Sequence, residues 1–143
     1  MKGIQSDVFE AVRSRVEATL TDAGYTADGR VWLKRVPKSL SVGYPRAVLR
    51  GQQRSAPQYD TLARAGVAFE LEVGIYAQKA TPVLTLTDAL TPRLTDVDDP
   101  ITIPGMNYLY ATLQDTLNPL TPEAERSDRF GRIILVNLYY RSK

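Results

Sequence analysis

The chain has 143 residues, 43% apolar and 24% charged, a balance typical of one globular domain and too apolar for a disordered chain. It contains no cysteine and no histidine, which excludes disulfides, thiolate metal sites and the commonest general base. No apolar run reaches the ~18–20 residues that span a bilayer, and no apolar segment follows Lys2 as in a signal peptide. We therefore expect one soluble intracellular domain, residues 1–143, without membrane contact.

The first predicted element is a helix over residues 7–23. Ser6 has the chemistry of an N-cap, and Gly24 suits the position just after the helix. Its apolar side chains recur with the helical period and are expected to pack on a sheet: Val8, Val12, Val16, Leu20 and Ala23.

Two strands and a long connection follow. Residues 31–36 are predicted as a strand that Pro37 ends, and residues 44–50 as a second strand. Pro45 near the start of the second strand fits a strand beginning or a sheet edge. Residues 51–64 are polar and are predicted to be a mobile connection.

The clearest pattern in the chain covers residues 65–77. Apolar residues occupy every second position there without a break: Ala65, Val67, Phe69, Leu71, Val73, Ile75 and Ala77. This alternation predicts a long half-buried strand. This strand and the second strand are predicted to form an extended antiparallel hairpin with one face exposed to solvent.

The next region is predicted to be a helix over residues 82–96. Thr81 resembles an N-cap, and Pro82 suits the first helical position. Pro92 is expected to kink or interrupt the helix. An extended conformation of residues 83–87 stays open as an alternative.

The last third of the chain predicts one more helix and one more strand. The helix covers residues 106–118, with Leu109, Leu113 and Leu117 on one face. Residues 129–140 form the strand, and because residues 133–136 are apolar on both faces we expect it to be central. The predicted class is α+β, a mostly antiparallel sheet of about four strands with the N-terminal helix and one or two further helices on one face.

Carboxylates are the remaining candidates for chemistry. Asp96, Asp98 and Asp99 have a spacing that loosely resembles a calcium loop, but the turn glycine and the closing glutamate are missing. Glu70 and Glu72 lie two apart on a strand, hence on one face. We interpret the first group as a solvated turn and the second as a solvent-facing row. We therefore assign no catalytic, cofactor or metal residue and expect no enzyme.

The charges are segregated along the chain. Residues 30–64 carry eight basic side chains and one acidic, whereas residues 65–128 carry three basic and ten acidic. Three interpretations follow: the two stretches neutralise each other within one subunit, they meet head-to-tail between subunits of a ring, or the basic stretch binds nucleic acid.

The order of the elements, with Tyr44-Pro45-Arg46-Ala47 in the second strand, resembles the tail terminator (tail-completion or neck) proteins of long-tailed phages. The resemblance covers most of the chain and rests on its layout. It implies a homo-oligomeric ring, a hexamer, that caps the tail tube, ends its polymerisation and joins it to the head connector. It also implies a place in the virion after assembly in the host cytoplasm, no catalytic residue and no cofactor.

Partners implied by this resemblance are further copies of the chain, the tail tube protein and the head–tail connector or neck proteins. DNA would pass through the lumen without sequence-specific binding, and residues 52–58 could line that lumen or grip the tube. Candidate contacts with the neighbouring subunit or the tube are Arg46, Arg50, Arg54, Arg64, Glu70 and Glu72.

The alternative is a small nucleic-acid-binding domain that uses Arg46, Arg50, Arg54 and Arg64. Aromatic residues that could stack on bases are sparse in this stretch, which weakens the case for single-strand binding. A carboxylate enzyme is a second and weaker alternative.

Overall fold

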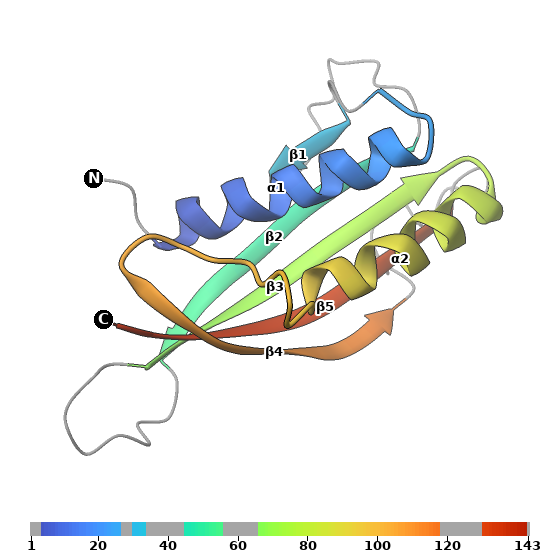
Figure 1. Cartoon of the computed structure of the whole chain (residues 1–143). Coiled ribbons are helices and arrows are strands. Elements are labelled where there is room, and N and C mark those ends of the chain that lie inside the picture. Colours follow the sequence, from blue (N-terminus) through green and yellow to red (C-terminus); the bar gives the residue numbers. More distant parts are fainter. Residues whose placement is uncertain (1–3, 27–29, 34–44, 56–65, 118–129, 143) are drawn as a thin grey trace.

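The computed structural model describes residues 4–26, 30–33, 45–55, 66–117 and 130–142. Within them two helices cover one face of a five-stranded sheet, which confirms the α+β class and adds one strand to the expected four (Figure 1). The elements in chain order are α1 (Ile4–Asp22), β1 (Val31–Leu33), β2 (Arg46–Ser55), β3 (Gly66–Ala77), α2 (Ala80–Leu94), β4 (Met106–Leu117) and β5 (Phe130–Ser142).

The sheet has the order β1-β2-β3-β5-β4. β1 runs parallel to β2, and every other neighbouring pair is antiparallel. β3 is the predicted alternating strand, and β2 joins it in the predicted hairpin. β5 lies between β3 and β4, so its predicted central place is confirmed.

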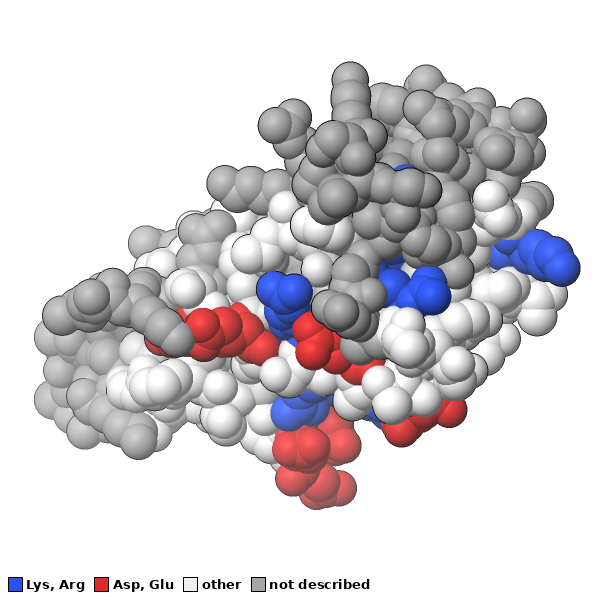
Figure 2. All heavy atoms as spheres, turned by 90° about the horizontal axis from the view of Figure 1, so that it is seen from above, with Lys and Arg blue, Asp and Glu red and all other residues white. Residues whose placement is uncertain are grey.

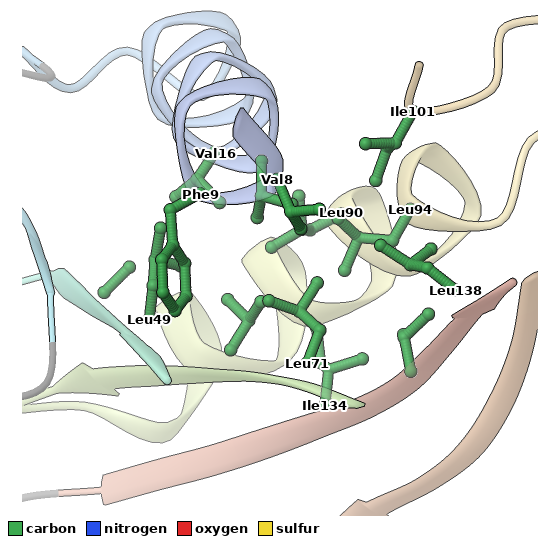
Figure 3. Close-up of a cluster of buried hydrophobic side chains, with 14 of the residues drawn as sticks. Val8, Phe9, Val16, Leu49, Leu71, Leu90, Leu94, Ile101, Ile134 and Leu138 are labelled. Atoms are coloured by element: carbon green, nitrogen blue, oxygen red, sulfur yellow. The ribbon is translucent and has the colours of Figure 1, made fainter. Parts of the chain in front are cut away.

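The core lies between this sheet and the two helices (Figure 3). Val8, Val12, Val16 and Leu20 of the predicted α1 stripe pack on it, whereas Ala23 lies past the end of the helix and is exposed. α2 packs on it through Leu86, Leu90 and Leu94. Burying each large apolar side chain contributes about 1.5–3 kcal/mol, so this layer is the main source of stability. Its fully buried members include Val8, Val12, Phe69, Leu71, Leu86, Leu90, Ile134 and Leu138.

The prediction for α1 is wrong at the start of the helix and confirmed at its end. α1 begins at Ile4, so Ser6 lies inside the first turn and is not the N-cap. At the other end Gly24 has φ 94° and donates its N–H to the Thr21 carbonyl at 3.0 Å, while Tyr25 donates to the Leu20 carbonyl at 2.9 Å. This is the Schellman pattern that the glycine predicted.

α2 confirms the predicted helix but not its predicted start. Lys79 is the N-cap residue and makes no side-chain capping bond, so Thr81 lies within the first turn. Pro82 is tolerated there because the first N–H groups of a helix have no intrahelical partner. Pro92 lies in the last turn, and the helix continues past it to Leu94.

The lengths of the first two strands differ from prediction. β1 is described only from Val31 to Leu33, and the rest of the predicted strand lies outside the described residues. β2 starts at Arg46 and continues through residues 51–55, which were predicted as a connection. The reason is tertiary: β3 offers pairing partners along this whole stretch, from Leu71 to Val67.

The predicted helix over residues 106–118 is wrong, because Met106–Leu117 is strand β4. The leucine spacing of four residues fits one face of a helix and also one face of a strand, whose period is two. Tyrosine and threonine, frequent in this segment, favour strands, and β5 supplies a partner along its whole length. Leu109 and Leu113 are 45% and 46% exposed, so they are not the buried stripe that a helix required.

Gly51 lies where two parts of the hairpin approach closely. A Cβ atom at this position would sit 2.5 Å from the Glu70 carbonyl oxygen and 2.6 Å from the Phe69 ring. The first of these neighbours is backbone in the middle of the sheet, which cannot move aside without breaking the register.

We predict that Gly51→Ala lowers the free energy of unfolding by about 1–3 kcal/mol, because the added methyl overpacks this contact. Gln53→Ala, an exposed position on the same strand, is the control and should stay within about 0.5 kcal/mol of the wild type. Urea unfolding followed by circular dichroism measures both. An unchanged midpoint for Gly51→Ala would contradict the close approach.

Tyr140 anchors the segment that leads into β4. Its side chain is fully buried, its hydroxyl donates to the Ile101 carbonyl at 2.7 Å, and its ring meets Tyr108 edge-to-face. Burial raises the pKa of the Tyr140 hydroxyl well above its ordinary value.

We predict that Tyr140→Phe costs about 1–2 kcal/mol at pH 7, because the buried Ile101 carbonyl loses its donor. The wild type should also lose stability above about pH 10, where the unfolded tyrosine releases its proton and the folded one does not. The variant lacks this titration, so its stability should fall less steeply with pH. Urea unfolding between pH 7 and 11 tests this, and equal slopes would refute it.

Candidate functional site

One face of the sheet is turned away from α1 and α2, and we call it the open face. Ala47 and Leu49 of β2 point into the core, so Arg46, Val48 and Arg50 point to the open face. The partners of these residues on β3 and β5 share this face because residues directly opposite each other in a sheet point the same way.

Three of the predicted contact residues come together on the open face. Arg50 lies directly opposite Glu72, and Gln52 lies opposite Glu70. The Gln52 side-chain amide donates to the Glu70 carboxylate at 3.2 Å. An opposite-charge pair across two strands contributes roughly 0.2–1 kcal/mol, so part of the basic and acidic stretches offset each other within one subunit here.

The other three predicted contact residues are placed differently. Arg46 is buried, 6% exposed, and lies opposite Tyr76, which is 2% exposed. Arg54 pairs with Ala68 near the end of the hairpin, and its side chain is outside what the structure describes. Arg64 also lies outside the described residues. Buried in its own subunit, Arg46 offers little surface to a partner.

The helical side of the molecule carries mixed charge. Figure 2 shows acidic and basic side chains interleaved on the face seen from above. Several are ion-paired, and exposed pairs of this kind contribute at most about 1 kcal/mol each. The pairs are Arg13–Glu17 at 2.9 Å, Arg93–Asp22 at 2.7 Å and Arg15–Asp99 at 3.4 Å.

The aspartate group after α2 forms an exposed turn, as interpreted from the sequence. The Asp98 N–H donates to the Asp96 carboxylate at 2.9 Å, and the Asp99 side chain is 82% exposed. Over the described part of the chain, no three histidine, cysteine or acidic residues are placed to hold a metal ion.

A cavity of about 10 Å³ lies between α1, α2 and the sheet, bordered by Val16, Leu20, Ala47 and Leu90. It has room for about one water molecule, far below the several hundred Å³ of an ordinary ligand pocket. Neither described helix combines the length and the apolar character needed to cross a bilayer.

Sequence reasoning missed the exposed apolar residues of β4. Leu109 and Tyr110 are each 45% exposed and Leu113 is 46% exposed, and the Tyr110 ring stacks on Tyr139 with centroids 4.4 Å apart. The error came from treating these leucines as the buried face of a helix. The tyrosines and threonines of the segment were the signal that could have identified a strand.

No known protein family matches the chain, and no curated protein matches it in sequence. Its fold is similar to that of a chain in a solved structure described as the virion of a native gene transfer agent particle. The TM-score is 0.66 and the sequence identity 12%, with 97% of this chain and 95% of that chain covered. At that identity the likeness shows a shared fold over the whole domain.

We predict that Arg46 and Arg50 differ in their effect on stability. Arg46→Ala removes a buried aliphatic stem and should lower the free energy of unfolding by about 1–3 kcal/mol. Arg50→Ala, on the solvated part of the open face, should cost about 0.5–1 kcal/mol. Urea unfolding followed through Trp32, the single tryptophan, measures both. Equal losses would contradict the placement of these residues.

Proposed function

We propose that the chain is a structural subunit of a phage-like virion. In this proposal it forms a homo-oligomeric ring, a hexamer, that caps the tail tube, ends its polymerisation and joins it to the head or neck connector. The observation that carries the proposal is the likeness to a virion chain over 97% of this chain and 95% of that one. The likeness therefore extends over nearly the whole length of both chains.

The proposed place in the tail comes from the resemblance of the sequence layout to tail terminator proteins. The N-terminal amphipathic helix, the hairpin of β2 and β3 and the final strand β5 are as that layout leads one to expect, whereas residues 106–117, expected as a helix, form strand β4. The likeness also favours a structural rather than an enzymatic role.

The proposed partners are further copies of the chain, the tail tube protein and the head–tail connector proteins. DNA passes through the lumen without sequence-specific binding. Arg50, Glu70 and Glu72 are the described contact candidates that have surface on the open face. Localisation follows from these partners: the virion tail or neck, after assembly in the host cytoplasm.

We expect the purified protein at high concentration to have six times the 15.9 kDa mass of one chain by light scattering. Glu10→Lys, exposed on α1, should leave this mass unchanged. High salt should lower the mass, since exposed charge contacts are screened. A strict monomer under all these conditions would refute the ring.

Nucleic-acid binding through the basic stretch is less well supported by the structure. Arg46 is buried and Arg50 lies opposite Glu72, so two members of the proposed patch are offset or hidden. A salt titration with duplex DNA separates the two functions, because a true binder loses affinity steeply with salt.

A further inference from the structure

β4 is an outermost strand of the sheet, and no described residue pairs with its outer side. Exposed strand edges present unpaired backbone N–H and C=O groups, and soluble proteins commonly protect them with lysine or proline. Over its twelve residues β4 contains no lysine, no arginine and no proline. It does contain two bulges, and these leave the regular stretch 110–113 between them.

The exposed apolar side chains of β4 make its edge more suitable for pairing with another strand. Of the six large apolar residues that are exposed in the described chain, three lie on β4: Leu109, Tyr110 and Leu113. Apolar side chains beside an unpaired backbone edge are the combination that stabilises an added strand. β4 is therefore the described edge best suited to pair with another chain.

The charge of the chain indicates what pairs with β4. β4 belongs to the acidic stretch 65–128, and Asp115 is its single charged residue. β1 and β2 belong to the basic stretch 30–64, and the strand order places them at the opposite side of the sheet. β1 itself carries no charge, but Arg30 directly precedes it, and its exposed Leu33 can meet the exposed apolar residues of β4. A head-to-tail contact between two copies therefore brings the side of Arg30 to the side of Asp115, whereas a two-fold contact of β4 with β4 brings two Asp115 residues to one edge.

We propose that β4 of one subunit pairs with the β1 side of the sheet in the next copy, so that one sheet continues into its neighbour. This contact rests on the proposed ring and specifies how the ring is built. It is heterologous, as a closed ring requires. Leu113 of one subunit then lies near Leu33 of the next, and both residues are 46% exposed in the subunit.

Cross-linking tests this arrangement, because the chain has no natural cysteine and each introduced one is unique. The Leu113→Cys and Leu33→Cys proteins are mixed and treated with a short bismaleimide, which tolerates small errors in register. We expect a covalent dimer that contains one copy of each variant. Leu84→Cys, 47% exposed on α2, replaces Leu33→Cys as a control of equal accessibility and should give no such dimer.

A second variant tests the same contact without an introduced cysteine. Leu113→Lys should convert the assembly to monomers, since a charge on the edge opposes strand pairing. Val97→Lys, 76% exposed in the loop before β4, makes the same change elsewhere and should keep the wild-type mass.

The outcomes separate this contact from the ring itself. A wild-type ring without the mixed cross-link, or a ring that survives Leu113→Lys, overturns the edge contact and leaves the ring standing. Dimers formed by Leu113→Cys alone indicate a two-fold contact and also overturn it. A wild type that is strictly monomeric overturns both proposals.

Discussion

The period-two alternation of β3 is the constraint on which the rest of the structure depends. β3 is paired along its length with β2 on one side and β5 on the other, so its register orients both neighbours. Phe69, Leu71 and Val73 point into the core, and the helices must cover them because leaving them in water would cost about 1.5–3 kcal/mol each. The same register forces Glu70 and Glu72 to the opposite face. One strand therefore decides where the core lies and which charges remain on the open face.

The two helices are held to each other by arginines rather than by apolar contacts alone. The Arg15 guanidinium donates to the carbonyls of Arg93, Asp99 and Pro100 at 2.7–2.9 Å. The Arg93 guanidinium returns to α1, donating to Thr19 at 3.0 Å and to Asp22 at 2.7 Å. The Arg93 carbonyl lies in the last turn of α2, where carbonyls lack intrahelical partners, and the planar Arg15 guanidinium bonds it together with two carbonyls of the segment that follows. Because this connection includes residues 99–100, it fixes where the chain leaves α2 on its way to β4.

The sequence predicted correctly the elements whose residue pattern fits only one kind of secondary structure. The alternation of β3 fits only a strand, and the stripe of α1 with Gly24 fits only a helix with a defined end. The leucines of β4 have a spacing that fits both, and pairing with β5 decided between them. Residues 51–55 are polar and by themselves predict a connection. Their strand structure comes from pairing with β3 rather than from their own propensity. The burial of Arg46 and the approach of Arg50 to Glu72 depend on register, which no single segment contains.

The charge segregation has a different meaning in the folded chain than along the sequence. In the middle of the sheet β2 lies beside β3, so Arg50 and Glu72 face each other and offset their charges inside one subunit. Neutralisation of this kind requires adjacent strands, and β1 and β4 have no such neighbour on their outer sides among the described residues. The large apolar residues that are exposed on described strands lie on these two edges: Leu33 on β1 and Leu109, Tyr110 and Leu113 on β4. β3 is the central strand between the β1 edge and the β4 edge. A contact that continues the sheet from one subunit to the next uses both edges of each subunit.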